Sequence, residues 1–280
     1  MATGQAGDSR GRDTFEAQGS AFLKQNLAEK PEFDYAENRP PRSFDLAGRT
    51  LTLVQGDDGG RYRHDFQEQV VTVEAVAGQE TGRRQVTTYE AFEMASGIFF
   101  VTYLASEKDS LAMAMDLERG AVTAVRGRME EDGIVSRVVQ GWLAEIAGEG
   151  PVAYHLPFSL GGTRLLNTYA HNVAYEHIYL TGAYETWLGV KGPQAGQADT
   201  EEYHAYKVAD GVYLLYWNEK ILTTQMTFLF NFFSGRCVAE LFARVDGQVV
   251  HNTIGAYTHL IHTKLPELPN VPRLDIYTGE

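Results

Sequence analysis

The chain contains an internal duplication, and this repeat restricts its possible folds more than any other feature. The segment Tyr62–Phe66 (YRHDF) returns as Tyr175–Tyr179 (YEHIY) about 113 positions later. Repeat units of solenoid proteins are only about 20–50 residues long, so a spacing above 100 predicts two similar small domains. Further matches at nearly the same spacing pair Phe44, Leu46 and Gly48 with Phe158, Leu160 and Gly162; Tyr89, Phe92, Gly97 and Phe99 with Tyr203, Tyr206, Gly211 and Tyr213; and Glu107-Lys108 with Glu219-Lys220.

Composition and charge exclude several classes of protein. A net charge of −13 argues against binding to nucleic acid or to anionic membranes, because both require surfaces rich in Lys and Arg. Cys237 is the single cysteine, which excludes an intrachain disulfide and a cysteine-based zinc site. No apolar run is long enough to span a bilayer, and the first residues lack a signal-peptide apolar region. These features predict a cytoplasmic protein.

Short alternating segments separated by Gly and Asp turns follow one another through both units. In the first unit, Arg49–Gln55 places Leu51 and Leu53 on one face and precedes the turn 56–60 (GDDGG). Such strands, about 8–12 residues apart, are typical of up-and-down barrels and sandwiches. The sequence predicts an all-β protein with two antiparallel barrels. In the second unit it predicts eight strands, at residues 163–169, 174–180, 183–190, 201–208, 212–218, 222–230, 236–244 and 248–258.

A helix is expected between the two barrels. Within residues 130–146 the apolar side chains recur at the spacing of one helical face, as Ile134, Val138, Trp142 and Ile146 illustrate. A second, shorter helix is expected from Phe15 to Leu27. The predicted domains are therefore an N-terminal tail with a short helix (1–40), a first barrel (41–129), a linking helix (130–150), a second barrel (151–265) and a C-terminal tail (266–280).

The repeated Tyr-x-His segment is the first candidate for chemistry. Residues two apart on a strand share a face, so Tyr62 and His64 should point into the first barrel, and Tyr175 and His177 into the second. An interior histidine beside tyrosines can act as a general acid or base. It can equally be a buried residue that a tyrosine hydroxyl or a backbone carbonyl satisfies. The repetition does not decide between these readings, because inherited structure also repeats.

The second unit carries more polar candidates than the first. Phe66, Phe92 and Phe99 of the first unit are replaced by tyrosines in the second, which makes the second barrel the predicted site. Glu219-Lys220 could be a rim ion pair or a mouth-lining acid and base. Three histidines near the C-terminus lack the spacing of a zinc motif, so the sequence predicts no metal site and no cofactor. The predicted site draws on Tyr179, Tyr184, Glu185, Trp187, Tyr203 and Trp217 in addition to the Tyr-x-His segments.

The second unit also resembles a known family. The runs at 172–187 (NVAYEHIYLTGAYETW) and 213–220 (YLLYWNEK), with Tyr203-His204 between them, are similar to the molybdenum cofactor biosynthesis protein F family. The resemblance covers roughly residues 40–262 and implies tandem lipocalin-like domains of the calycin type. The fold it implies is similar to that of phenolic acid decarboxylases, which use Tyr, Arg and Glu without a cofactor. Their motif has no residue-by-residue match in this chain, so that chemistry is an analogy of fold.

Two functions are compatible with these features. The first is a cofactor-independent enzyme that performs proton-transfer chemistry on a small aromatic or apolar molecule, by decarboxylation, dehydration, isomerisation or cyclisation. His177 would then be the acid or base, Tyr175 would polarise an oxygen and Glu185 would orient or exchange a proton. Tyr179, Tyr184, Trp187, Tyr203, Trp217, Tyr62 and His64 would contact the substrate. The alternative is a non-catalytic carrier of a small ligand, linked to molybdenum cofactor synthesis, and a homodimer is compatible with either.

Overall fold

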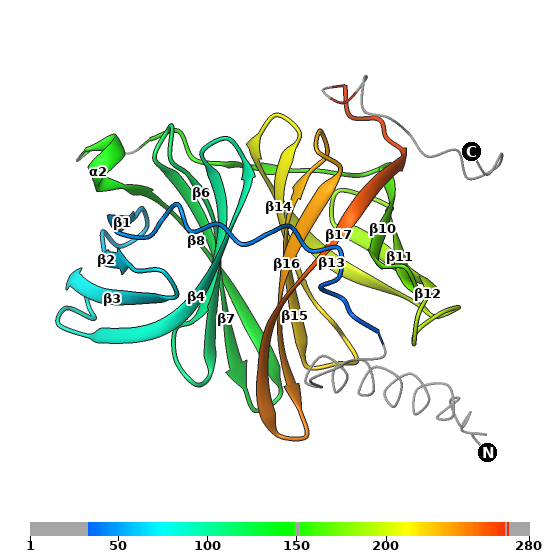
Figure 1. Cartoon of the computed structure of the whole chain (residues 1–280), viewed down its shortest axis with the longest axis horizontal. Coiled ribbons are helices and arrows are strands. Elements are labelled where there is room, and N and C mark those ends of the chain that lie inside the picture. Colours follow the sequence, from blue (N-terminus) through cyan, green and yellow to red (C-terminus); the bar gives the residue numbers. More distant parts are fainter. Residues whose placement is uncertain (1–32, 149, 151, 267, 269–280) are drawn as a thin grey trace, which may run out of the picture.

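Two β-barrels stand side by side, and each is an antiparallel meander of eight strands (Figure 1). The computed structural model describes residues 33–148, 150, 152–266 and 268. The predicted fold class, two tandem antiparallel barrels in an all-β protein, is confirmed. The first barrel comprises β1 (Thr50–Gln55), β2 (Arg61–Phe66), β3 (Val70–Ala77), β4 (Arg84–Ala95), β5 (Ile98–Leu104), β6 (Asp109–Asp116), β7 (Ala121–Glu130) and β8 (Gly133–Leu143).

The second barrel repeats this order strand for strand. Pairing of β10 with β17 and of β12 with β13 makes its ring continuous, and a short strand β9 adds to β13 from outside. Its strands are β9 (Leu156–Phe158), β10 (Arg164–Ala170), β11 (Val173–Tyr179), β12 (Tyr184–Lys191), β13 (Ala198–Ala209), β14 (Val212–Asn218), β15 (Thr224–Asn231), β16 (Arg236–Val245) and β17 (Gln248–His262). Strands β1–β8 therefore correspond to β10–β17.

One end of each barrel is closed in the same way in both copies. Leu46 and Leu160, matched in the repeat, are fully buried members of the two interior clusters. Each precedes a glycine with positive φ, Gly48 at 81° and Gly162 at 83°, a conformation that L residues with a side chain rarely adopt. The amide of each glycine donates to the last residue of the Tyr-x-His strand, Phe66 or Tyr179. The segment that closes this end, called the plug below, is therefore common to both copies, as the strands are.

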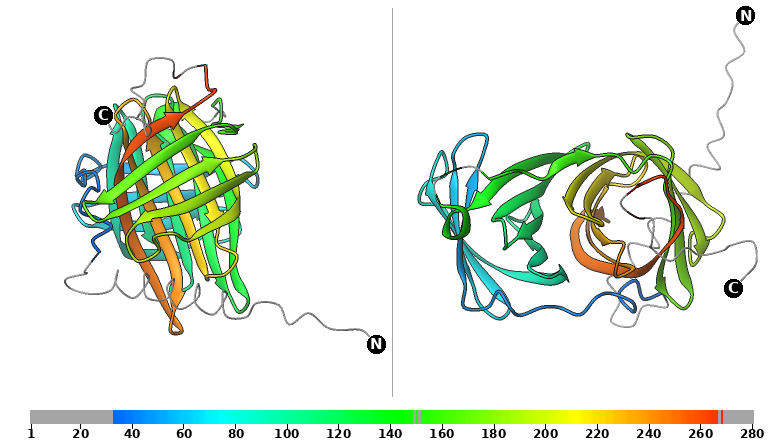
Figure 2. Two further views of the ribbon diagram at one scale, coloured as in Figure 1. Left: turned by 90° about the vertical axis from the view of Figure 1, so that its right-hand side faces the viewer. Right: turned by 90° about the horizontal axis from the view of Figure 1, so that it is seen from above.

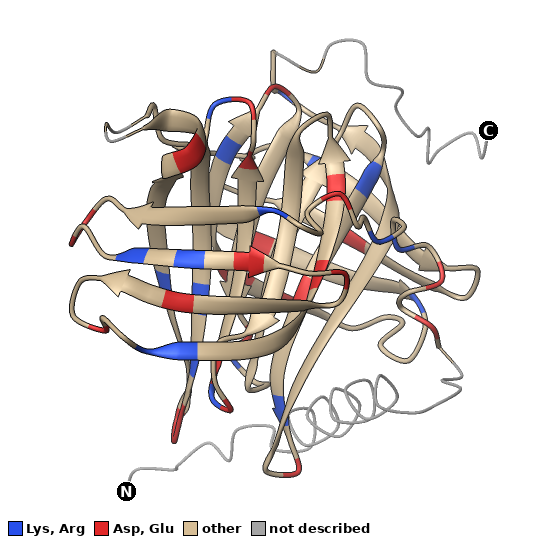
Figure 3. Ribbon diagram, turned by 60° about the vertical axis from the view of Figure 1, so that its left-hand side comes forward, with Lys and Arg blue, Asp and Glu red and all other residues tan. Residues whose placement is uncertain are grey.

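The barrels pack against each other through the outer faces of β4–β7 and β13–β16. Phe100 and Leu214 are fully buried in this shared apolar layer. The right-hand view of Figure 2 looks down the two barrels as neighbouring rings. Because β5 contacts the barrel interior on one side and this layer on the other, its residues are buried almost without interruption. Elsewhere on the first barrel, acidic and basic side chains are interspersed on the outer face (Figure 3), and Arg63 pairs there with Glu74 at 2.6 Å.

A buried polar cluster also joins the two barrels. Glu240 on β16 is fully buried and accepts hydrogen bonds from Thr102 at 2.7 Å and from Ser110 at 3.3 Å. The imidazole of His251 lies 2.9 Å from the same carboxylate. Since a buried carboxylate is tolerated only when several donors reach it, this cluster favours one relative placement of the barrels.

The predicted linking helix is wrong. Residues 133–143 form β8, which pairs with β7 along its whole length and closes the barrel against β1. The only helix there is the single turn α2 (Ala144–Ala147). Val139 and Leu143 face the barrel interior, whereas Val138 packs in the layer between the barrels. Apolar residues on both faces of the strand imitate the spacing of a helix, and β-branched residues favour the strand.

Two further expectations fall partly or wholly outside the described residues. The short helix from Phe15 to Leu27 lies outside them, as does most of the C-terminal tail. Among the described residues, no helix has the length and apolar character needed to cross a bilayer. With β8 included, the strands of the first barrel extend to Leu143, beyond the predicted boundary at residue 129.

Substitution of Gly141 tests strand β8 directly. A Cβ atom there would lie 2.2 Å from the carbonyl oxygen of Val54, across the three-residue seam that closes the barrel. Gly141→Ala should therefore lower the free energy of unfolding by about 1–3 kcal/mol, as overpacking does. In a helix the same substitution would raise it by about 1 kcal/mol. Urea denaturation gives the sign, and Val135→Ala on the exposed face of β8 serves as the control.

Candidate functional site

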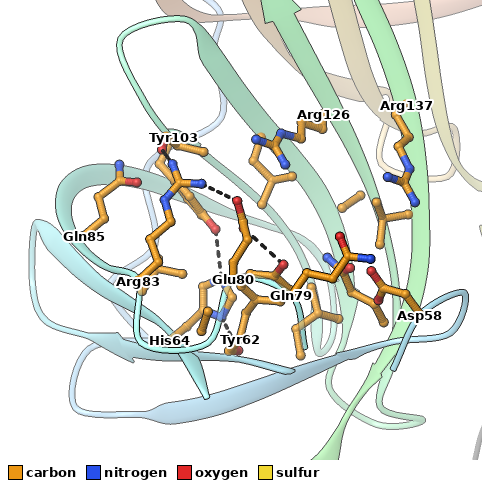
Figure 4. Close-up of a pocket in the computed structure, with 18 residues that line it drawn as sticks. Asp58, Tyr62, His64, Gln79, Glu80, Arg83, Gln85, Tyr103, Arg126 and Arg137 are labelled. Atoms are coloured by element: carbon orange, nitrogen blue, oxygen red, sulfur yellow. Dashed lines mark hydrogen bonds and ion pairs between the residues drawn. The ribbon is translucent and has the colours of Figure 1, made fainter. Parts of the chain in front are cut away.

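The first barrel contains a cavity of about 240 Å³ at its open end (Figure 4). Its deeper walls are largely apolar, and its mouth carries charged and hydrogen-bonding side chains. Ligand sites commonly combine apolar walls with a few placed polar groups. The residues that line the cavity include Leu53, Tyr62, His64, Val73, Glu80, Arg83, Tyr103, Ala105, Leu111, Arg126, Arg137 and Val139.

His64 and Tyr103 form a hydrogen-bonded pair in the wall of this cavity. The Nδ1 atom of His64 lies 2.9 Å from the carbonyl oxygen of Tyr62, and its Nε2 atom lies 2.8 Å from the Tyr103 hydroxyl. A carbonyl can only accept, so Nδ1 carries the proton of the neutral ring and Nε2 accepts from Tyr103. Burial lowers the pKa of His64 to about 4, which keeps the ring neutral at physiological pH.

Arg126 and Arg137 lie directly opposite each other on β7 and β8, and both line the cavity. Figure 4 shows the two guanidinium groups on the same side of the pocket. The buried carboxylate of Asp109 holds Arg126, at 3.1 Å from its guanidinium, whereas exposed Asp57 pairs with Arg137. Like charges directly across a strand pair repel each other, and here a carboxylate partner offsets each of the two charges.

The β3–β4 loop completes the mouth. The Tyr62 hydroxyl donates to Glu80 at 3.2 Å, and Arg83 pairs with the same carboxylate group at 2.6 Å. The second barrel has the same contact, because the Tyr175 hydroxyl donates to Gln194 at 2.8 Å. The two loops have similar sequences, GQETG at residues 78–82 and GPQAG at 192–196. The matches between the two units given above did not include this one.

The second barrel is filled where the first is hollow. Its cavity measures only about 60 Å³. In the strand pairings, Trp187 stands opposite His177 as Val73 stands opposite His64. Bulkier side chains thus occupy the equivalent wall. Leu241 and Asn252 stand where the first barrel has its two arginines, since they form the corresponding pair of β16 and β17.

The structure brings part of the predicted site together inside the second barrel. Tyr175, His177, Trp187 and Trp217 all line the small cavity. His177 Nδ1 lies 3.1 Å from an oxygen of Glu185, whose side chain is fully buried. These residues are neighbours as predicted, but they enclose little free space.

Three other predicted residues lie elsewhere in the second barrel. Tyr179 and Tyr203 pack against each other near the plugged end, with ring centroids 5.0 Å apart. The Tyr203 hydroxyl donates to the carbonyl of Thr181 and accepts from the amide of Leu160, both at 3.0 Å, which is a structural role. Tyr184 is 47% exposed and does not line the cavity. The remaining two predicted contacts, Tyr62 and His64, belong to the cavity of the first barrel.

Two carboxylates of the second barrel have unusual acidities. Burial, together with the charge of Glu201, raises the pKa of Glu219 to about 8. Burial raises the pKa of Glu201 to about 7. The sequence suggested an ion pair between Glu219 and Lys220 at the rim, but Lys220 instead lies 3.6 Å from Glu201. Within the described chain, no three His, Cys, Asp or Glu side chains are grouped as a metal ion would require.

The residues that sequence reasoning missed are Tyr103, Arg126 and Arg137. A signal for them existed, because extending the repeat to the last two strands aligns the arginines with Leu241 and Asn252. The two units were matched only through the Phe and Tyr positions of the earlier strands, and these positions favoured the second barrel.

Comparison with solved structures gives only weak similarity. A putative beta-lactamase from Burkholderia vietnamiensis aligns at 13% identity over 38% of this chain and 97% of its own, with a TM-score of 0.31. A DNA polymerase sliding clamp from Pseudomonas aeruginosa aligns at 8% identity over 88% of this chain and 83% of its own, with a TM-score of 0.12. Neither score indicates a shared overall fold.

Sequence comparison gives a clear relationship. Protein MoaF of Klebsiella aerogenes is 27% identical over 153 residues, which is 49% of this chain and 58% of that protein. Residues 27–131 match the MoaF N-terminal domain, and residues 156–264 match the MoaF C-terminal domain. The two matched regions contain most of the strands of the two barrels, although β8 lies beyond the first. The chain belongs to the MoaF family.

Proposed function

We propose that the protein binds a small organic anion in its first barrel and that the Tyr103–His64 pair exchanges a proton with it. A connection with molybdenum cofactor synthesis, which the family's name implies, is part of this proposal. The reaction class expected from the sequence, proton transfer without a cofactor, is retained. The proposed site moves from the second barrel to the first because, among the described residues, the cavity inside the first barrel measures about 240 Å³ and that inside the second about 60 Å³.

The observation that carries the proposal is the cross-strand pair of arginines. Arg126 and Arg137 face each other at the cavity in a protein with a net charge of −13. The second barrel shows that the fold accepts Leu241 and Asn252 in the same places. An anion that lies between the two guanidinium groups when the ligand is bound would account for two arginines at these positions. Planar guanidinium groups suit a carboxylate or a phosphate particularly well.

The body of the ligand would lie against the apolar walls below the arginines. Leu53, Val73, Leu111 and Val139 supply those walls. The volume of about 240 Å³ accommodates roughly one aromatic ring with short substituents. A small aromatic or apolar acid fits both the walls and the mouth.

The Tyr103–His64 pair is arranged for proton transfer. Tyr103 donates its proton to Nε2 of His64, so the lone pairs of the phenol oxygen remain for a ligand. If a ligand proton moves to that oxygen while the tyrosine proton moves to Nε2, the charge develops on His64. The carbonyl of Tyr62 already accepts from the other ring nitrogen and would stabilise the imidazolium. Tyr103 would be the acid or base at the ligand, and His64 would be the group behind it.

Binding can be tested with matched acids and amides. We expect small aromatic carboxylic acids to raise the melting temperature and to bind measurably in calorimetry, and their uncharged amides to do neither. Arg137→Asn should abolish binding, whereas Arg84→Asn, which removes the same charge from an exposed position on β4, should not. Equal binding of acids and amides, or normal acid binding by Arg137→Asn, would contradict the proposal. Unchanged turnover by Tyr103→Phe would remove the Tyr103–His64 pair from the chemistry, and acid binding without any turnover by the wild type would indicate a carrier rather than an enzyme.

Arg137→Asn also leads to a prediction about the stability of the unliganded protein. Arg137→Asn removes one of two like charges on paired strands and loses only an exposed ion pair with Asp57, which contributes about 0–1 kcal/mol. The unliganded variant should therefore unfold at a temperature no lower than that of the wild type. A clear loss of stability in thermal denaturation would show that Arg137 has a structural role instead.

Stability should also depend on pH through His64. Because burial lowers the pKa of His64 from 6.5 to about 4, the unfolded chain takes up this proton at a higher pH than the folded protein. The free energy of unfolding should decrease as pH falls from 6.5 to 4, by up to about 3 kcal/mol from His64. Buried His155, with a pKa also lowered to about 4, adds to the same window.

Urea denaturation at several pH values measures this dependence. His64→Gln and His155→Gln should each remove part of the slope between pH 4 and 6.5. A slope that His64→Gln leaves intact would show that the imidazole is already charged in the folded protein.

A further inference from the structure

The cavity of the second barrel is partly filled by a side chain that does not come from the barrel. Residues 33–43, the N-terminal strap, run across both barrels (Figures 1 and 2), and Tyr35 points from the strap into the second. Only 2% of Tyr35 is exposed. Its ring lies 5.7 Å from that of Tyr169 and 6.2 Å from that of Tyr175, and its hydroxyl is 2.9 Å from the Tyr175 hydroxyl.

The two cavities occupy equivalent places in the two barrels. Around the second cavity, Tyr175, His177 and Trp217 stand at the positions of Tyr62, His64 and Tyr103 in the first. Tyr35 is therefore an addition to a site that both barrels inherited. It takes the space that remains open in the first barrel. The further equivalent lining pairs are Gln55 and Tyr169, Val73 and Trp187, Glu80 and Gln194, Ala105 and Glu219, Leu111 and Met226, and Val139 and Ile254.

Polar groups of this cavity remain without partners when Tyr35 is in place. Thr224 lines the cavity, is only 3% exposed, and its hydroxyl has no hydrogen-bond partner among the described residues. One oxygen of Glu185, which contacts His177 but does not itself line the cavity, is also buried without a partner among the described residues. Buried polar atoms without partners are rare and costly, and about 60 Å³ of free space adjoins Tyr35. These unpartnered polar atoms and the free space could accommodate a ligand with polar groups that the tyrosine ring lacks.

The strap is held by several contacts to both barrels. The Asn38 amide donates to the carbonyl of Tyr169 at 2.9 Å, and Arg39 and Arg42 pair with Glu90. The Gly255 amide donates to the carbonyl of Tyr35 at 3.1 Å. A Cβ at Gly255 would lie 2.8 Å from Arg39 Cα and 2.8 Å from a ring carbon of Pro40. The strap therefore depends on this glycine for its seat on β17. Its other end is held by Ser43, whose amide donates to the carbonyl of Ala91 at 2.8 Å.

We infer that the second barrel is a binding site for a phenolic ring, for which Tyr35 substitutes in this structure. A free phenol would take the place of the Tyr35 ring, with its hydroxyl on Tyr175 and Gln194 and any further polar substituent toward Thr224. Binding would require the strap to leave, so Tyr35 competes with the ligand. This site is separate from the anion site of the first barrel and does not depend on the function proposed there.

The probe for this site is p-cresol, which is the tyrosine side chain as a free molecule. In the full-length Tyr35→Gly variant, p-cresol should bind saturably and raise the melting temperature. Toluene, which lacks the hydroxyl, should bind about fivefold more weakly, since one hydrogen bond is worth about 1 kcal/mol. Two of the three tryptophans, Trp187 and Trp217, line the cavity, so tryptophan emission reports binding at this site. Tyr184→Gly, which removes an exposed tyrosine of the same barrel, is the control and should gain no such binding.

Competition with the strap is tested in the wild type. Trypsin can cleave the strap after Arg42, which Ser43 follows, but not after Arg39, which Pro40 follows, so cleavage at Arg42 measures release of the strap. We expect p-cresol, but not toluene, to accelerate this cleavage, and Gly255→Ala to bind p-cresol more tightly than the wild type because its strap is loosened. If p-cresol fails to bind both Tyr35→Gly and Gly255→Ala, the site does not exist. If it binds Tyr35→Gly but changes neither cleavage of the wild type nor binding to Gly255→Ala, Tyr35 is a permanent core residue and the inference is wrong.

Discussion

The interior of an eight-stranded barrel is only just wide enough to be filled by its own side chains. This constraint decides what each half of the molecule can do, because a single large or small residue at an inward position separates a packed core from a ligand cavity. In the first barrel, Val73 and Tyr103 leave about 240 Å³ open, whereas Trp187 and Trp217 stand at the same positions in the second. The strands, the plugs and the Tyr-x-His segment are common to both barrels. Function therefore depends on the few inward positions at which the copies differ.

Charge follows the same division. The first barrel carries Arg126 and Arg137 in direct opposition, and the second carries Leu241 and Asn252. We propose that the charged pair gives a place for an anion, which the neutral pair lacks. Paired arginines that only one of two similar barrels carries indicate a function of that barrel rather than a requirement of the fold. The second barrel has the smaller cavity, and the side chain of Tyr35 lines it.

Much of the fold was predictable from the sequence, and the error has a clear physical origin. The duplication and the alternation of apolar residues predicted two barrels and the inward direction of His64 and His177. Residues 133–143 were misread because Val138 and Val139 are buried on opposite faces of one strand, a pattern that periodicity alone cannot separate from a helix. The repeat itself contained the correction, since the predicted strand at 248–258 in the second unit requires a counterpart in the first.

The site was less predictable than the fold. Phe92 and Tyr206, one of the pairs used to favour the second barrel, lie in the layer between the barrels and face neither cavity. The position of Tyr35 follows from long-range contacts of the strap with β17, which no local pattern records. The role of Arg126 required the pairing of β7 with β8, and that pairing was concealed by the helix prediction.

The central claim is that the first barrel holds an anion between two opposed arginines. NMR of protein labelled with ¹⁵N-arginine tests it most directly, because each guanidinium Nε–H gives its own signal. On titration with benzoate, the signals of Arg126 and Arg137, assigned by substitution, should shift together with one dissociation constant, while that of Arg84 stays in place. If benzoate binds and neither of these two signals moves, the anion lies elsewhere and the account of the first barrel is wrong.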